Sequence, residues 1–201
     1  MEDKDKLLSN ERFNNPEFAE RYAHKHLKMS LNFAGKLTAM LSDKNFKKGK
    51  VLDSGCGPGF MIIELAKKFT ECEFVGIDLS EPLLEIAGNK NQKEGLNERI
   101  KFLKADVLNI PFPDNYFDFV ININMLHLVE EPVKMINEIE RVLKPEGFFF
   151  ITDLRKSILG ILEKEIKSAL TPKEANELIT RSNLSKGKFS SDLIWWSYQN
   201  I

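Results

Sequence analysis

The chain has 201 residues, and 29 Lys and Arg residues against 30 Asp and Glu residues leave a net charge of -1. A chain of this length suits one domain that buries roughly 70% of the surface that its unfolded form exposes, so no metal or disulfide support is required. The balanced charge lacks the positive field that binders of duplex nucleic acid use. We therefore expect no nucleic-acid partner.

Cysteine and histidine residues are too few and too scattered to predict a metal site. A zinc site needs a cluster of such ligands at short spacing, and none is formed by Cys56, Cys72, His24, His26 and His127. The start MEDKDK lacks the basic and apolar regions of a signal peptide. The uncharged run FVININMLHLV is shorter than the ~20 residues that span a bilayer. These features favour a cytoplasmic protein with reduced thiols.

The first part of the chain predicts two helices before any strand. Asn15 and Pro16 form a typical helix start ahead of the stretch EFAERYAHKH, because asparagine favours the cap position and proline the first turn. A second amphipathic stretch, LNFAGKLTAML, follows it. We expect both helices to precede the first strand.

From Lys50 onward, short apolar runs alternate with helical stretches. The predicted strands, in chain order, are KVLDS, EFVGID, IKFLKAD, FDFVININ and FFFITDL. The predicted helices between them are MIIELAKKF, PLLEIAGNKNQKEG and PVKMINEIERVLK. Strands that are apolar throughout and alternate with helices indicate a parallel sheet covered on both faces. The predicted fold class is therefore α/β.

Turn and capping residues mark several boundaries. The sequences SEP at 80–82 and TPKE at 171–174 are typical of helix starts. KPEG at 144–147 predicts the end of a helix before the FFF strand. The final segment, KGKFSSDLIWWSYQNI, suits an aromatic-rich strand or hairpin.

The stretch VLDSGCGPGF, at 51–60, places a glycine-rich loop after the first strand. The dinucleotide fingerprint G-x-G-x-x-G fits at Gly55 and Gly57, but its third position is Phe60, and Gly59 comes one residue early. A phosphate-binding loop fails because Phe60 and Met61 stand where Lys and Ser or Thr are required. The loop therefore favours a ligand that approaches the backbone closely without a phosphate.

Three aspartates extend this site. Asp53 precedes the glycines and would repel a pyrophosphate but attract a cation, which favours S-adenosylmethionine with its sulfonium and ammonium groups. Asp78 ends the second strand, where a carboxylate can accept from both ribose hydroxyls, and Asp106 with the backbone of 105–107 ends the third, where adenine can be met. Each aspartate alone could be a turn former or a helix cap. Together, after three successive strands, they indicate a ligand site.

With these residues assembled, the chain resembles the class I S-adenosylmethionine-dependent methyltransferases, in the small-molecule branch that includes quinone-biosynthesis enzymes. The resemblance runs over about residues 48–155, through VLDSGCGPG, GIDLS, KADVLNIPFPDNYFDFV, MLHLVEEP and EIERVLKPEGFFFITD. It implies a Rossmann-like, doubly wound, mostly parallel seven-stranded sheet with a C-terminal antiparallel hairpin. It also divides the chain into a helical lid at 1–48, a cofactor-binding core at 49–155, and helices with the hairpin at 156–201.

The resemblance also implies a cofactor and the residues that contact it. The resemblance implies that S-adenosylmethionine is converted to S-adenosylhomocysteine and that the glycine loop holds the methionine end. It also implies that Tyr22 lies near the methionine carboxylate and that residues 122–125 run past the sulfonium. The implied cofactor-binding residues are Tyr22, Asp53, Gly55, Cys56, Gly57, Gly59, Asp78, Leu79, Ala105, Asp106, Val107 and Asn122.

The acceptor is predicted to be a small molecule. The segment NINM departs from the N/D-P-P-Y/F motif of enzymes that methylate amino groups of DNA bases, and no Pro-Cys nucleophile pair is present. His127 is the only histidine near the carboxyl edge of the predicted sheet and is a candidate general base, although the LH pair recurs in the family without a shared catalytic role. A nicotinamide oxidoreductase, a noncatalytic cofactor-binding protein and transfer of another group stay open as alternatives. A monomer or a homodimer is expected.

Overall fold

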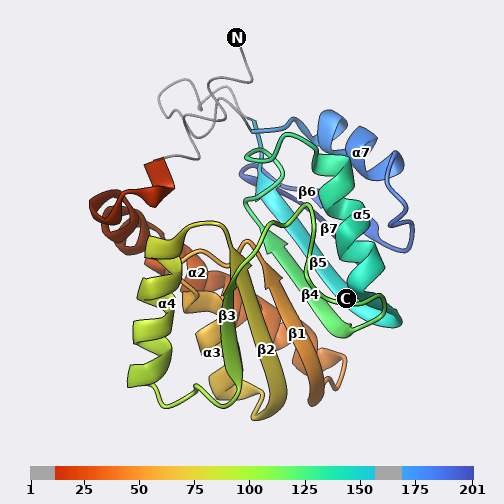
Figure 1. Ribbon diagram of the computed structural model, residues 1–201. Helices are drawn as coiled ribbons and strands as arrows, with labels where there is room; N and C mark the ends of the chain where they lie inside the picture. Colours follow the sequence, from red (N-terminus) through yellow and green to blue (C-terminus); the bar gives the residue numbers. More distant parts are fainter. Residues whose placement is uncertain (1–11, 157–168) are drawn as a thin grey trace.

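Seven strands form one sheet in the order β3-β2-β1-β4-β5-β7-β6. The computed structural model describes residues 12–156 and 169–201 (Figure 1). The first five strands run parallel to one another, and β7 is antiparallel to both of its neighbours, β5 and β6. The strands are β1 (Lys48–Ser54), β2 (Glu71–Asp78), β3 (Ile100–Lys104), β4 (Phe117–Ile123), β5 (Leu143–Leu154), β6 (Lys188–Ser191) and β7 (Trp195–Gln199). The predicted fold class, with its C-terminal antiparallel hairpin, is confirmed.

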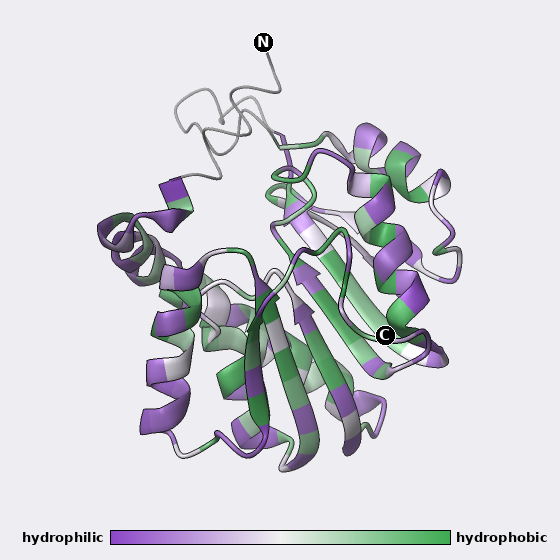
Figure 2. Cartoon of the chain, in the orientation of Figure 1, coloured by the Kyte–Doolittle hydropathy of each residue, from purple (hydrophilic) through white to green (hydrophobic). Residues whose placement is uncertain are grey.

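Helices cover both faces of this sheet (Figure 1). They are α2 (Pro16–Asp43), α3 (Phe60–Lys68), α4 (Glu81–Lys93), α5 (Pro132–Val142) and α7 (Pro172–Thr180), with a short 3₁₀ helix, η1 (Arg12–Asn14). One cluster of buried residues joins the sheet to α2 and α3, and a second cluster joins it to α5 and α7. Because both faces are covered, the middle of each central strand is mainly apolar, and Figure 2 shows these strands mostly in the hydrophobic colour, with hydrophilic bands mainly toward their ends.

The N-terminal part forms one long helix where the sequence predicted two. Asn15 caps α2 as predicted, since its Oδ1 accepts from Phe18 N at 2.9 Å, but α2 then continues without a break for 28 residues. The prediction of two helices is wrong because the buried positions keep a single helical phase through the polar stretch between them. These positions are Ala19, Ala23, Phe33, Ala34, Leu37 and Leu41.

Gly35 offers a test of the helical state of α2. It lies in the interior of the helix, and a Cβ there would meet nothing within 4 Å. Gly35→Ala should stabilise the fold by about 0.5–1 kcal/mol, because alanine loses less backbone entropy. Urea denaturation measures this. Gly95→Ala is the matched control: its surroundings are equally open, but a φ of +68° makes alanine destabilising.

Most predicted boundaries are confirmed by capping contacts. Ser80 Oγ accepts from Leu83 N at 3.3 Å at the start of α4, and Thr171 forms a complete capping box with Glu174. The exception is the KPEG segment, because α5 already ends at Val142 and the segment lies within β5. Part of the predicted helical content of 156–201 lies outside the described residues. Among the described residues, no helix combines the length and apolarity needed to cross a membrane.

Candidate functional site

The glycine loop lies between β1 and α3 and is tied to β2 by backbone hydrogen bonds. Gly55 N and Cys56 N both donate to Ile77 O at 2.9 Å. Gly55, Gly57 and Gly59 have φ angles of 86°, 51° and 68°, a region that side chains rarely adopt. A Cβ on Gly57 would meet nothing within 4 Å, so this part of the backbone is open to a ligand.

Asp53, just before the loop, is a buried acid without a partner. Only 2% of its surface is exposed, and its carboxyl group forms no hydrogen bond or ion pair with the described residues, although such groups are normally paired. Burial, together with the nearby charge of Asp78, raises the pKa of Asp53 to about 8. A cationic ligand would supply the missing partner.

Asp78 joins the glycine loop to the beginning of α4. Its Oδ2 accepts from Gly57 N at 2.8 Å, and its Oδ1 accepts from Ser80 N at 2.9 Å. Burial raises its pKa, and backbone hydrogen bonds from Ser80, Gly57 and Leu79 oppose that rise. Each carboxylate oxygen can accept a second hydrogen bond, so Asp78 can still receive two hydroxyl groups. Leu79, beside it, is 55% exposed and offers an apolar surface.

The third predicted acid, Asp106, is exposed and already shapes its own turn. Its Oδ1 accepts from Leu108 N at 2.8 Å, which is the turn-forming role that the sequence left open. The loop is nonetheless part of the same site, because Ala105 N donates to Asp78 O at 3.1 Å. Val107 is buried at 3% exposure and anchors this loop in the core. The ends of β1, β2 and β3 are therefore brought together as predicted.

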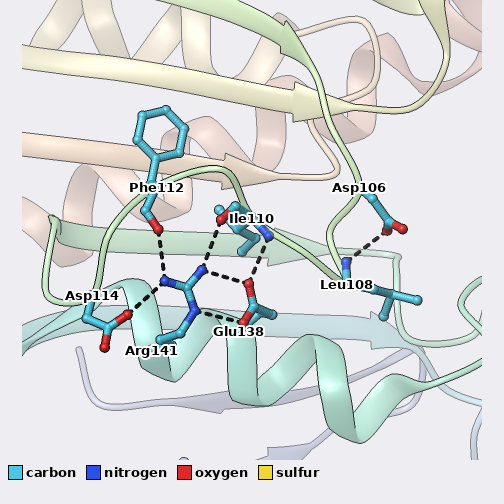
Figure 3. Close-up of polar contacts among 7 residues, drawn as sticks. All are labelled: Asp106, Leu108, Ile110, Phe112, Asp114, Glu138 and Arg141. Carbon is cyan, nitrogen blue, oxygen red and sulfur yellow. Dashed lines mark hydrogen bonds and ion pairs between the residues drawn. The ribbon is translucent and has the colours of Figure 1, made fainter.

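An ion pair on α5 holds the loop that follows Asp106 (Figure 3). Arg141 contacts both oxygens of Glu138 at 2.8 Å and donates to the carbonyls of Phe112 and Ile110 at 2.8 and 2.9 Å. Glu138 Oε2 accepts from Ile110 N at 2.8 Å. Sequence reasoning missed this pair, because its loop partners stand about 30 residues earlier and no local pattern marks them.

Arg141→Met should destabilise the fold by about 2–3 kcal/mol. The variant keeps the apolar stem but removes charge-assisted hydrogen bonds and leaves two loop carbonyls without their donors. Urea denaturation of the variant measures the loss. Lys173→Met is the control, because the 4.0 Å pair of Lys173 with Glu177 is largely exposed and should contribute almost nothing. Equal stabilities of the two variants would contradict the anchoring role.

Asn122 lies inside β4, beside the end of β1. Its Nδ2 donates to Ser54 O at 2.8 Å, while its Oδ1 and the hydroxyl of Ser54 are buried and have no hydrogen-bond partner within the described part of the chain. Cys56 is also buried, and burial raises the pKa of its thiol. Unpartnered buried polar atoms are rare in folded proteins and often face a ligand or an ordered water.

Tyr22 belongs to a ring cluster on the N-terminal segment. Its ring packs against Phe13, Phe18 and His26 at centroid distances of 5.1, 6.3 and 4.2 Å. Ser80 Oγ donates to Phe13 O at 2.6 Å, which places this cluster beside the end of β2. The segment that carries Tyr22 therefore borders the site, and the contact of Tyr22 itself with a ligand stays a prediction.

His127 lies in the loop after β4, and its ring contacts the end of β5. Its Nδ1 lies 2.6 Å from Asp153 Oδ1, and both side chains are buried. Met125 of the same loop lies against the glycine loop, since a Cβ on Gly55 would come within 2.4 Å of it. The loop after β4 is thus a second wall of the site. No group of three metal-ligating side chains occurs among the described residues.

The assembled residues fit the cofactor that the resemblance implies. S-adenosylmethionine carries an ammonium and a sulfonium, for which Asp53 is an unpaired buried acid. It also carries a ribose diol. Each oxygen of Asp78 can accept one more hydrogen bond from this diol, beside the open backbone of Gly57.

Comparison with known proteins identifies the family. The family described as "Methyltransferase domain" matches residues 45–195. The sterol 24-C-methyltransferase ERG6B of Gibberella zeae is 41% identical over 100 residues, which cover 50% of this chain and 26% of that protein. The fatty-acid O-methyltransferase of Mycolicibacterium smegmatis is 34% identical over 118 residues, which cover 59% of this chain and 41% of that protein. The chain thus matches less than half the length of either relative.

A solved structure shares the fold over almost the whole chain. A methyltransferase from Aquifex aeolicus, described as SAM-dependent, aligns with a TM-score of 0.76 and 24% identity over 92% of this chain and 97% of that one. The predicted resemblance to S-adenosylmethionine-dependent methyltransferases is confirmed. The chain therefore belongs to the methyltransferase-domain family.

Proposed function

We propose that this protein binds S-adenosylmethionine and transfers its methyl group to a small-molecule acceptor. The observation that carries the proposal is the glycine loop hydrogen-bonded to Asp78, with the unpaired buried Asp53 beside it. Asp53 can give up its proton and pair with a cationic group that binds beside it, whereas a pyrophosphate would gain nothing from this acid and would be repelled by its ionised form. The arrangement therefore supports the sulfonium cofactor over a nicotinamide dinucleotide.

Each part of the site has a separate task in this function. Asp53 binds the ammonium group, Asp78 accepts from the ribose hydroxyls, and Leu79 with residues 105–107 lines the adenine. The cofactor supplies a methyl group on a positively charged sulfur, which is already a good leaving group. The protein therefore acts mainly by holding the acceptor in line and close. The segment with η1 and the start of α2 is proposed to cover the site as a lid.

The acceptor is proposed to be a small molecule and not a nucleic acid. Two curated relatives are named for a sterol and a fatty acid, and the charge of -1 disfavours a polyanion. A cytoplasmic location and a monomeric or homodimeric state belong to the same proposal. Gel filtration with light scattering tests the assembly.

The first test is calorimetric titration of the purified full chain with S-adenosylhomocysteine, with NAD titrated in parallel. Saturable binding of the homocysteine ligand and no heat with NAD supports the proposal. Binding of NAD alone overturns it and favours the oxidoreductase alternative.

The second test is a turnover screen with S-adenosylmethionine and mass spectrometry of the products. The acceptors are a hydroquinone, a sterol and a fatty acid. A mass gain of one methyl group supports methyl transfer, whereas a gain that matches another part of the cofactor supports transfer of a different group. A protein that binds S-adenosylhomocysteine but yields no product from a broad panel is a noncatalytic binder.

A further inference from the structure

The ring of His127 is fixed by two contacts with a single buried carboxylate. Asp153 Oδ1 lies 2.6 Å from His127 Nδ1, and Asp153 Oδ2 accepts from His127 N at 3.2 Å. Leu154 N also donates to Oδ1, at 2.7 Å. His127 is 5% exposed and Asp153 is fully buried. With the carboxylate as acceptor, the proton of a neutral ring lies on Nδ1, and Nε2 carries the lone pair.

Nε2 is the atom of His127 that remains available. It forms no hydrogen bond with the described residues, and it is not fully enclosed by them. An acid that fixes Nδ1–H and leaves Nε2 accessible is the arrangement that turns a histidine into a general base. A histidine that was enclosed on all sides would have both nitrogens bonded inside the protein, whereas Nε2 of His127 can be reached by a ligand or by water.

The surroundings of His127 independently indicate a ligand. Asn124, three residues earlier, is 9% exposed, and its Oδ1 is enclosed without a hydrogen-bond partner among the described residues. Asn122 Oδ1 on β4 and Ser54 Oγ on β1 likewise have no partner within that part of the chain. These atoms lie at the carboxyl edge of the sheet, where Met125 contacts the glycine loop. This edge therefore carries buried polar groups, one of them in the loop after β4, to which a second molecule can form hydrogen bonds.

We propose that His127 is the catalytic base of this protein, that Asp153 positions its ring, and that the acceptor is a neutral hydroxyl compound such as a phenol or hydroquinone. The inference rests on the proposed function and goes beyond it by naming the acceptor class. A tertiary amine or a thioether has no proton to lose, and a carboxylic acid is already ionised at neutral pH. None of these acceptors needs a base.

The proton balance of the step is complete. The acceptor O–H bond breaks as its oxygen gains the methyl group, and the proton passes to Nε2 of His127. The sulfur of the cofactor keeps the electron pair of the broken S–CH₃ bond, so the sulfonium charge disappears and the imidazolium charge replaces it. Asp153 stabilises that imidazolium, and the proton leaves to water after the methyl ether is released.

The first test reads the ring directly and needs no acceptor. The ¹⁵N shifts of the His127 ring are followed in the free full chain from pH 6 to 9, and His127→Gln identifies the signals. We expect a proton on Nδ1 and an unprotonated Nε2 at pH 8, and loss of this single tautomer in Asp153→Asn. Among the described residues, Asp153 is the only ionisable side chain hydrogen-bonded to His127. A proton on Nε2 throughout this range would overturn the proposal.

The second test compares acceptors and variants at saturating cofactor. A hydroquinone, dodecanoic acid, a long-chain tertiary amine and a long-chain thioether are the probes. With the hydroquinone, His127→Gln should lower kcat by about 10²–10⁴-fold and leave the affinity for S-adenosylhomocysteine unchanged. Activity of this variant should recover at high pH as the acceptor ionises. Asp153→Asn should lower kcat less, and His24→Gln, on the exposed side of α2, should change nothing.

The outcomes separate this proposal from the proposed function. If only the amine, the thioether or the acid is methylated, His127 is not the base, although methyl transfer stands. The same conclusion follows if His127→Gln turns over the hydroquinone at the full rate. If no probe is methylated, the tautomer of His127 in the first test decides the proposal: a proton on Nδ1 supports it, and a proton on Nε2 overturns it. If the wild-type chain fails to bind S-adenosylhomocysteine, the proposed function itself fails, whatever the state of His127.

Discussion

Asp53→Asn is expected to make the free protein more stable at alkaline pH and its cofactor complex weaker. The side chain is buried without a hydrogen-bond or ion-pair partner among the described residues, and burial with the charge of Asp78 raises its pKa to about 8 from 3.8. In the folded protein the group therefore holds a proton that the unfolded chain has already released. Folding therefore either keeps this acid in its neutral form or loses stability by burying its charge.

The sign of the pH effect follows from proton linkage. Between about pH 4 and 8 the folded state binds more protons than the unfolded state, so the free energy of unfolding falls as pH rises through this window. An asparagine of the same shape carries no such charge. The variant should match the wild type near pH 4 and exceed it by about 2–5 kcal/mol at pH 9. Urea denaturation at both pH values measures the difference.

The same substitution that stabilises the free protein should weaken cofactor binding. An ammonium group beside Asp53 lowers its pKa, so binding of S-adenosylhomocysteine at pH 7 should release protons. Calorimetry in phosphate and in Tris buffer separates this release from the binding heat. Asp53→Asn should abolish most of it and weaken binding at pH 8 by about 10–100-fold. Unchanged proton release would assign the linkage to Asp78, whose pKa burial also raises.

Features that rest on short-range patterns could be predicted from the sequence. The apolar runs of β1 to β5, the caps at Asn15, Ser80 and Thr171, and the three glycines each carry their reason within a few residues. The acids after β1 and β2 could be placed together because parallel strands end at one edge. The long α2 was missed because its polar middle hides a continuous apolar face.

Features that depend on distant partners could not be predicted. Asp153 stands 26 residues after His127, near the end of β5, where an aspartate is often a turn former. The sequence therefore indicated the histidine but not its acid. The Arg141 and Glu138 anchor is likewise invisible, because a charged pair three residues apart on a helix is usually a solvated face. Only the register of β4, β5 and α5 brings these groups to their partners.

Asp78→Ala should weaken binding of S-adenosylhomocysteine by about 10–100-fold, or about 1.5–3 kcal/mol. Two losses contribute to this effect. Gly57 N and Ser80 N lose their acceptor, at 2.8 and 2.9 Å in the wild type, so the glycine loop is held less well. The proposed hydrogen bonds from the ribose hydroxyls to the carboxylate also disappear.

A cycle with a modified ligand separates the two losses. The second ligand is the analogue of S-adenosylhomocysteine that lacks both ribose hydroxyls. If Asp78 accepts from the diol, the wild type binds this analogue much more weakly, whereas Asp78→Ala hardly distinguishes the two ligands. If the variant loses the same affinity for both ligands, Asp78 acts only by holding Gly57 and Ser80, and the ribose would have to be bound elsewhere. Because the Asp78 oxygens each keep a free acceptor position beside the open Gly57 backbone, we expect the first result.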